Sequence, residues 1–229
     1  MITPPPPHTS NIETVLFDLD GTLVHVELEF FFSEAHRLFS ALEFEYIVSD
    51  IENAYRRGNL FELFPAEERE AMATRFWEDY RHEDYPHPRA LEGVHTALHE
   101  LQSMGLQLGI VTARVESPEQ IRKTLSTIGL DEVFPLILSH GVDGPYAKDK
   151  VLLVDKALQH FRSTRERTLL IGDSAGDIVS GKRAGLALSI GVTSGGISRE
   201  TLETFEPDYV LESVLELPSL LKALRTTSG

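Results

Sequence analysis

Short, nearly continuous apolar runs that alternate with helical patterns constrain the fold of this chain most strongly. Six runs have the length and the β-branched content of strands: 14–18, 106–112, 133–139, 167–173, 186–192 and a weaker one at 208–211. Because their apolar character is almost unbroken, we expect both faces of each strand to be buried, as in a parallel sheet. Helical patterns separate the runs over 89–229, which predicts an open, mainly parallel α/β sheet with helices on both faces.

Residues 23–88 interrupt this alternation. They contain no convincing strand but several helical stripes, and we interpret their many aromatic residues as core packing. This segment has 15 acidic residues, 6 arginines and no lysine, a net charge of −9. We therefore predict three parts: a flexible, proline-rich tail over 1–13, an α/β core formed by 14–22 and 89–229, and a small all-helical domain inserted at 23–88.

The composition limits the partners of the chain. Lysine and arginine total 21 against 36 aspartates and glutamates, a net charge of −15, so we expect no nucleic-acid partner and no anionic membrane surface. The absence of cysteine excludes disulfides, thiolate metal sites and cysteine nucleophiles. No apolar run approaches the roughly 18 residues of a membrane span, and MITPPPPHTS has no signal-peptide pattern. We expect a cytoplasmic protein, and the sequence leaves its oligomeric state open.

Two of the predicted strands end in pairs of acidic residues. Asp18 and Asp20 follow the first strand, and alternate residues of an extended chain face the same side. Asp173 and Asp177 follow the fourth strand, one helical turn apart if a helix begins at once. Each pair alone has a purely structural explanation. Asp18 and Asp20 could lie in a solvated turn, and Asp173 and Asp177 could be the N-cap and a first-turn acid of a helix. Two pairs at one edge of the sheet favour a site for Mg²⁺, which prefers hard oxygen ligands.

Other polar residues are predicted at the same edge. Thr112 ends the second strand and is followed by Ala113 and Arg114, where a hydroxyl and backbone N–H groups suit the anionic oxygens of a substrate. Lys148 precedes a predicted helix and is placed to offset the acidic charge. Lys150 is a rival for that role, and we prefer Lys148 for its spacing to the helix.

The order of these motifs resembles the haloacid dehalogenase superfamily, which consists mostly of phosphatases. The matching segments are VLFDLDGTLV, GIVTAR, AKDKVLL and LLIGDSAGDIVSGKRAG, and the resemblance runs from Thr14 to about Leu221. It implies a Rossmann-like core, and the helical segment 23–88 is similar to the cap that this superfamily inserts between its first two motifs. The most similar subgroup contains the phosphoglycolate phosphatases and β-phosphoglucomutases.

The resemblance also implies a role for each motif residue. Asp18 would be the nucleophile that forms an aspartyl-phosphate, and Asp20 would be the general acid and then the base. Thr112 would donate a hydrogen bond to the transferring phosphoryl group, and Lys148 would steady the nucleophile. The implied ligands of Mg²⁺ are Asp18, the backbone carbonyl of Asp20, Asp173 and, directly or through water, Asp177.

The expected function is therefore hydrolysis of a small phosphate monoester by a Mg²⁺-dependent phosphatase, with a small phosphorylated metabolite as the partner. Two alternatives stay open: a phosphosugar mutase, which uses the same acids, and a non-catalytic phosphate-binding protein on this fold. Two other activities of this superfamily are disfavoured. A dehalogenase would not need a second acid such as Asp20, and a phosphonatase would need a cap lysine for a Schiff base, which segment 23–88 lacks.

The adjacent cations Arg56 and Arg57 are the clearest candidates for substrate binding by the cap. They end a predicted helix within an otherwise acidic segment. Cations are also favourable at a helix C-terminus for purely structural reasons. Both interpretations stay open at this stage.

Overall fold

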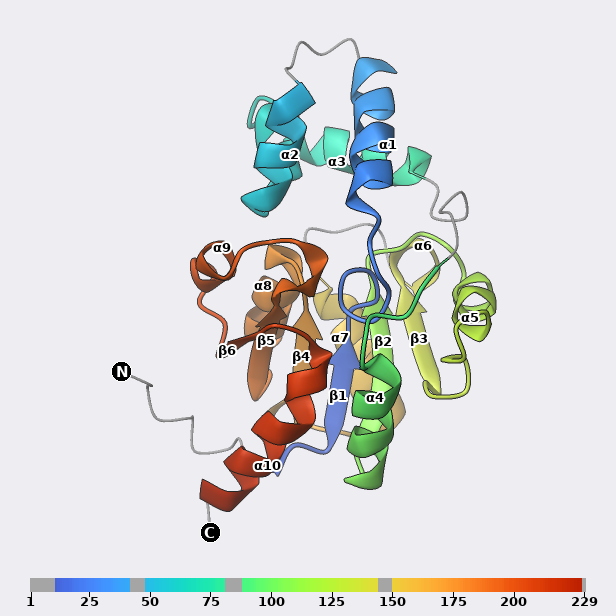
Figure 1. Ribbon diagram of the computed structural model, residues 1–229, viewed down its shortest axis with the longest axis vertical. Coiled ribbons are helices and arrows are strands. Elements are labelled where there is room, and N and C mark those ends of the chain that lie inside the picture. The colour runs from blue at the N-terminus through green and yellow to red at the C-terminus, as the bar shows by residue number, and fades with distance from the viewer. Residues whose placement is uncertain (1–10, 42–47, 81–87, 144–149, 228–229) are drawn as a thin grey trace.

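The computed structural model describes residues 11–41, 48–80, 88–143 and 150–227, and its centre is a six-stranded sheet (Figure 1). The strand order is β3-β2-β1-β4-β5-β6, and every pairing is parallel. The strands are β1 Thr14–Phe17, β2 Gln107–Thr112, β3 Leu136–Ser139, β4 Thr168–Gly172, β5 Leu188–Val192 and β6 Tyr209–Leu211. All six predicted strands are therefore present, and the predicted parallel α/β sheet is confirmed.

The third strand is shorter than predicted. Residues 133–135 form a turn, and the strand begins at Leu136. Pro135 has no N–H to donate to a neighbouring strand, so it does not extend the ladder. Phe134 is nevertheless fully buried, with its ring 5.8 Å from that of Phe17. The apolar run at 133–139 therefore has two parts: a turn whose Phe134 packs into the core, and a strand that begins at Leu136.

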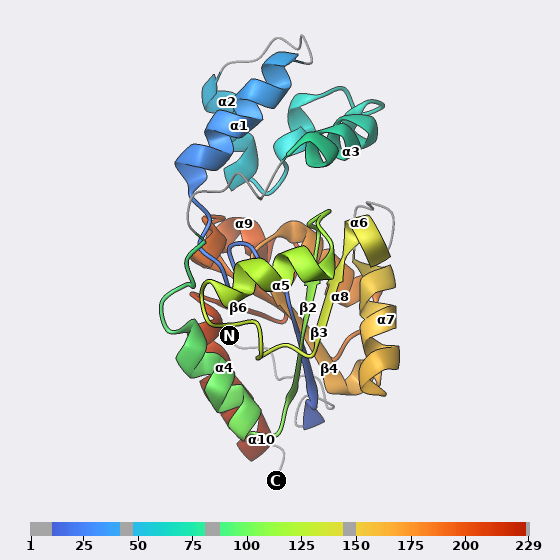
Figure 2. The same cartoon turned by 90° about the vertical axis from the view of Figure 1, so that its right-hand side faces the viewer.

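Two apolar layers cover the sheet. Val15 and Phe17 of β1 pack on one side with α4 (Val94–Ser103), α5 (Pro118–Ser126) and α10 (Leu217–Thr227). Leu16 packs on the other side with α7 (Val151–Phe161) and the end of α8 (Ala175–Arg183). Figure 2 shows α7 across the sheet from α4 and α10. The remaining elements of the core are the short helices α6 (His140–Asp143) and α9 (Arg199–Glu203) and the 3₁₀ turns Arg165–Arg167, Thr193–Gly195 and Val214–Glu216.

The strand order reverses direction at β1, and this places the acidic motifs together. Phe17, the last residue of β1, is in register with Ile110 of β2 and Ile171 of β4. The residues that follow these strands therefore emerge beside one another at the carboxyl edge. In open α/β sheets, this switch point is the usual place for a ligand.

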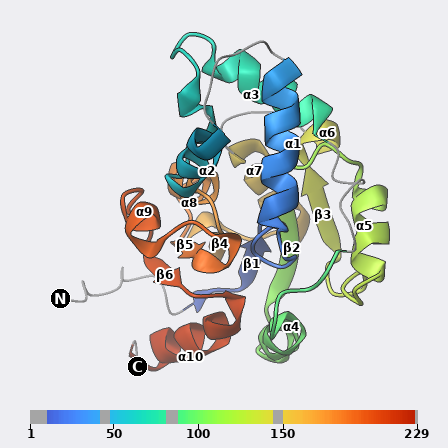
Figure 3. The same ribbon diagram turned by 45° about the horizontal axis from the view of Figure 1, so that its top comes forward.

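A helical cap lies over this edge (Figures 1 and 3). It consists of α1 (Leu28–Ala41), α2 (Val48–Arg56), the 3₁₀ turn Leu60–Leu63 and α3 (Arg69–Asp79), all within the predicted insertion 23–88. The cap has its own core around Phe31, Phe39 and Phe76. Two extended connections join it to the sheet, where the His25 N–H donates to the Arg89 carbonyl at 2.8 Å. Residues 1–10 of the predicted tail lie outside the described residues.

No helix in the described part of the chain combines the length and the apolar character that crossing a membrane requires.

Candidate active site

A cavity of about 300 Å³ lies between the cap and the carboxyl edge of the sheet. Most of the residues that the sequence predicted for the site line it from the core side: Asp18, Asp20, Thr112, Ala113, Arg114 and Asp173. Residues that are distant in sequence thus meet in one place, as the strand order requires.

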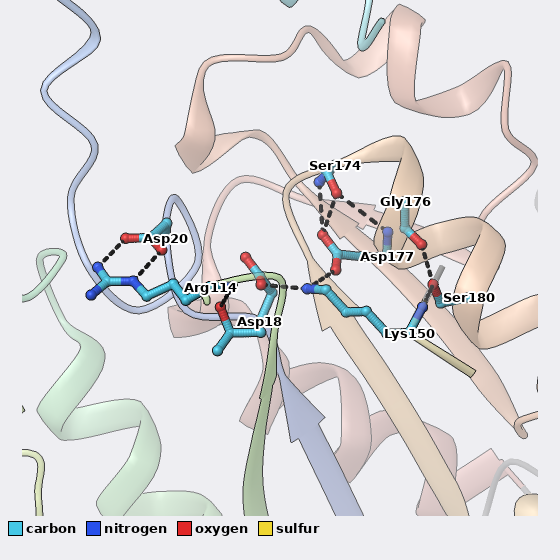
Figure 4. A network of polar contacts seen from close by, with 9 residues as sticks. Asp18, Asp20, Arg114, Lys150, Ser174, Gly176, Asp177 and Ser180 are labelled. Carbon is cyan, nitrogen blue, oxygen red and sulfur yellow. Dashed lines mark hydrogen bonds and ion pairs between the residues drawn. The ribbon is translucent and has the colours of Figure 1, made fainter. Parts of the chain in front are cut away.

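A lysine connects two of the acids (Figure 4). The Nζ of Lys150 donates to Asp18 Oδ1 at 2.5 Å and to Asp177 Oδ1 at 2.6 Å. The backbone N–H of Lys150 donates to the Ser180 hydroxyl at 2.8 Å. Lys150 stands at the N-cap of α7, so the start of this helix and the hydroxyl on α8 both fix its position.

The position of Lys150 bears on the choice between the two candidate lysines. Lys148, the preferred candidate from the sequence, lies outside the described residues. Lys150, its rival, is 6% exposed and contacts the predicted nucleophile Asp18 directly. Spacing in the sequence alone could not decide which lysine contacts Asp18, because this depends on the residue at which α7 begins.

Asp20 has a different cationic partner. The guanidinium of Arg114 donates to both carboxylate oxygens of Asp20, at 2.7 Å from Nε and 2.6 Å from the terminal nitrogen. Arg114 is only 5% exposed, and Glu116 lies 3.9 Å from its other terminal nitrogen. The sequence predicted Arg114 as a substrate contact. The structure adds that it holds Asp20, which lies 94 residues earlier in the chain.

The start of α8 fixes Asp177. Ser174 is the N-cap of this helix, and its hydroxyl and backbone N–H donate to Asp177 Oδ2 at 2.6 and 3.1 Å. Since Lys150 occupies Oδ1, both carboxylate oxygens of Asp177 have donors. Asp177 therefore closes a capping box and orients Lys150 with the same side chain.

Two glycines allow close approach to Asp173. Gly21 has a φ of +74°, and a Cβ on it would lie 2.4 Å from Asp173 Oδ2. A Cβ on Gly195 would lie 1.7 Å from the same oxygen. The Ser194 hydroxyl donates to the Gly21 carbonyl at 2.6 Å and holds the two loops together. The 194–195 loop carries no acidic or basic group, so the sequence gives no signal that it belongs to the site.

Burial and mutual repulsion change the protonation of the acids. Burial raises the pKa of Asp18 from 3.8 to about 7, because the attraction of Lys150 offsets only part of the desolvation and Asp177 adds repulsion. Burial and repulsion from Asp18 and Asp177 hold the pKa of Asp173 well above its usual range. Although burial opposes it, the attraction of Asp177 and Asp18 raises the pKa of Lys150, so this lysine stays charged.

The acidic cluster has the composition of a cation site. Ligand oxygens from Asp18, Asp173 and Asp177 all lie within 4.8 Å of one another. Carboxylate oxygens are hard ligands that suit Mg²⁺. Because the oxygens of Asp177 already accept from Lys150 and Ser174, the residues most open to a direct bond are Asp18 and Asp173.

The two arginines predicted to bind substrate do not line the cavity. Arg56 forms an exposed ion pair with Glu52 at 2.8 Å, and Arg57 forms one with Glu62. Charged partners on the cap therefore hold both side chains at its surface. This geometry favours the helix-terminal interpretation of the pair, and the role in substrate binding stays a prediction without structural support.

Residues beside the arginine pair do reach the cavity. Tyr55, Gly58 and Asn59 line it from the cap. The Tyr55 hydroxyl donates to the Gly195 carbonyl at 2.8 Å and so connects the cap to the loop next to Asp173. Tyr55 was not predicted as a site residue, because aromatic residues at helical spacing in the cap are expected to pack in its core. His140, which follows β3 and also lines the cavity, was missed as well.

Residues 15–190 match the sequence model of the family described as haloacid dehalogenase-like hydrolase. The chain belongs to this family. Membership in the haloacid dehalogenase-like hydrolases confirms the resemblance inferred from the motifs, and it confirms that the protein is an enzyme rather than a non-catalytic binding protein.

Individual relatives cover almost the whole chain. Pyrophosphatase PpaX of Anoxybacillus flavithermus is 33% identical over 215 residues, which are 92% of this chain and 97% of the relative. A haloacid dehalogenase-like family hydrolase from Streptococcus pneumoniae has a similar structure, with a TM-score of 0.70 at 18% identity over 92% of this chain and 99% of its own. A predicted phosphoglycolate phosphatase from Haemophilus somnus has a TM-score of 0.67 at 20% identity, covering 92% of this chain and 98% of its own.

Proposed function

We propose that this hydrolase is a Mg²⁺-dependent phosphatase that hydrolyses a small phosphate monoester through an aspartyl-phosphate on Asp18. One observation carries the proposal: a buried carboxylate, held by a lysine and flanked by further acids, faces a cavity under the cap. Covalent catalysis of this kind divides one difficult displacement into two easier ones.

Asp18 attacks phosphorus in the first step, and the bond from phosphorus to the leaving-group oxygen breaks. The ammonium of Lys150, 2.5 Å from Asp18 Oδ1, reduces the repulsion between the nucleophile and the phosphoryl oxygens. Thr112, at the end of β2, lines the cavity and can donate its hydroxyl to a phosphoryl oxygen. The resulting aspartyl-phosphate keeps the phosphoryl group while the alcohol departs.

We assign both proton transfers to Asp20. It lies two residues after the nucleophile and lines the same cavity, so it can give a proton to the departing alkoxide. In the second step it takes a proton from the water that attacks phosphorus, and inorganic phosphate leaves with Asp18 regenerated. Arg114 holds both carboxylate oxygens of Asp20 and favours its ionised form, so Asp20 must release one of these contacts while it carries the proton.

Asp18 and Asp173 would hold Mg²⁺ directly. Asp177 would bind the ion through a water molecule, or would act only by orienting Lys150. When bound there, Mg²⁺ would neutralise charge on the phosphoryl oxygens. Burial, together with repulsion between the acids, raises the pKa of Asp18 and of Asp173, and this supports the assignment because a bound cation would stabilise their ionised forms.

The test is phosphate release from a broad panel of small phosphate esters, with inorganic pyrophosphate included because of the name of the Anoxybacillus relative. We expect Mg²⁺-dependent release that stops in excess chelator and returns with Mg²⁺. Asp18→Asn, which is nearly isosteric, should lower kcat by at least about 10³-fold. Comparable activity of the wild type and Asp18→Asn, or full activity in chelator, would contradict the proposal.

A further inference from the structure

The cap side of the cavity is aromatic. Five rings line it: Phe31, Tyr55, Phe61, Trp77 and Tyr80. The other described cap residues of the lining are aliphatic, apart from Gly58 and Asn59. None of the described residues that line the cavity from the cap carries a charge.

These rings form one packed array rather than separate side chains. The ring of Phe31 lies 5.1 Å from that of Tyr55, 5.7 Å from that of Tyr80 and 6.4 Å from that of Trp77. Phe61 lies 6.5 Å from Trp77, with the rings edge to face. Tyr55, Phe61 and Trp77 remain partly exposed, so their surfaces are open to the cavity. The wall is therefore preorganised for an apolar group.

The described cations of the cap lie elsewhere. Arg37, Arg56 and Arg57 pair with acids on the cap surface, and Arg69 donates to the backbone carbonyls of Glu62 and Phe64. None of the described cap arginines lines the cavity. A carboxylate or second phosphoryl group on a substrate would thus meet no described cation on this side.

Lys150 and Arg114, the lysine and arginine among the described residues that line the cavity, already have acidic partners. Lys150 donates to Asp18 and Asp177, and Arg114 donates twice to Asp20. Both belong to the phosphoryl-transfer machinery. A second anionic group on the substrate would compete with Asp18, Asp177 or Asp20 for these two cations, whereas an uncharged leaving group would not.

We propose that the preferred substrate is a phosphate monoester with an uncharged, largely apolar leaving group, such as an aryl or benzyl alcohol, which packs against the aromatic wall of the cap. The inference rests on the proposed phosphatase function and names its substrate class. It differs from a pyrophosphate or phosphoglycolate substrate, whose leaving groups are anionic. Among the described cap residues that line the cavity, Asn59 has a side-chain amide that can form a hydrogen bond with a polar atom of the leaving group.

Binding can be measured without turnover. Trp77 is the single tryptophan of the chain and lines the cavity, so its fluorescence reports on the leaving-group site. The Asp18→Asn protein is titrated at constant free Mg²⁺ with benzyl phosphate, phosphoglycolate, pyrophosphate and inorganic phosphate. We expect benzyl phosphate to bind at least about 10-fold more tightly than the other three and to change the fluorescence most. Equal or tighter binding of phosphoglycolate or pyrophosphate would overturn the inference.

A matched pair of variants tests the wall locally. Asn59→Lys adds a cation to the cavity, and Ala71→Lys adds the same charge to an exposed position on α3 outside it. In the Asp18→Asn background, Asn59→Lys should tighten phosphoglycolate binding about 10-fold, and Ala71→Lys should change it less than about two-fold. No gain from Asn59→Lys, or an equal gain from Ala71→Lys, would contradict a local uncharged wall.

The two proposals fail in different ways. Absence of Asp18-dependent phosphate release from every ester would refute the phosphatase function, whatever the order of affinities. Release from anionic substrates in preference to benzyl phosphate would keep the phosphatase and refute the substrate class.

Discussion

The raised pKa of Asp18 makes a quantitative prediction for stability. In the folded protein without metal, burial raises this pKa from 3.8 to about 7, with Asp177 adding repulsion and Lys150 opposing. In the unfolded chain the carboxyl returns to its ordinary value. Between these two pH values the folded state binds a proton that the unfolded state has lost, so the free energy of unfolding falls as pH rises.

The size of the effect follows from the same values. Each pH unit between the unfolded and folded pKa lowers the free energy of unfolding by about 1.4 kcal/mol, so the interval from pH 5 to about 7 contributes about 3 kcal/mol. Above pH 7 the contribution stays constant. Asn does not titrate, so Asp18→Asn should gain about 3 kcal/mol relative to the wild type between pH 5 and pH 8. Removing the charge of Asp18 also lowers the pKa of Asp173, which acts in the same direction.

Urea unfolding of the two proteins in chelator, at pH 5 and at pH 8, measures this difference. A saturating concentration of Mg²⁺ at pH 8 provides the control, because the ion should stabilise the wild type more than Asp18→Asn. A difference between the proteins that does not change with pH, or that favours the wild type at pH 8 in chelator, would refute the account of Asp18 as a buried and incompletely compensated acid.

Three other substitutions have defined outcomes in the phosphate-release assay. Lys150→Met should lower kcat by at least about 10²-fold through loss of the charge beside the nucleophile, and a smaller loss than this would remove Lys150 from the phosphoryl site. Gly195→Ala would place a Cβ 1.7 Å from Asp173 Oδ2, so the Mg²⁺ concentration for half-maximal activity should rise about 10-fold; an unchanged value would separate this loop from the metal site. Arg114→Lys cannot keep the bidentate contact with Asp20 and should lower kcat/KM about 10-fold, an effect that wild-type kinetics would exclude.

Much of the fold could be predicted from the sequence because a parallel sheet leaves a strong signal. Strands buried on both faces need nearly continuous apolar runs, and each of the six runs contains a strand. Local sequence signals are also strong at α5, where Ser117 and Gln120 form a capping box at the start of the helix. The largest boundary error is at Leu136, because Phe134 is buried although it lies in a turn, and an apolar run does not distinguish a buried turn from a strand.

The acids of the site were predictable for the same reason, since each follows a recognisable strand. The pairings between side chains were not. The contact of Arg114 with Asp20 depends on the register of β1 against β2, and the contact of Lys150 with Asp18 depends on where α7 begins. The cap was the least predictable part. Aromatic residues such as Trp77 serve its core and also line the cavity, and only the orientation of the helices separates these roles.

The central claim is that Asp18 carries the phosphoryl group during turnover. Borohydride reduction of enzyme quenched during turnover converts an aspartyl-phosphate to homoserine, which peptide mass spectrometry locates in the chain. We predict homoserine at position 18 when Mg²⁺ and a hydrolysed ester are both present, and none without the ester or in Asp18→Asn. Sustained phosphate release with no modification at position 18, or with homoserine at another aspartate, would contradict the claim.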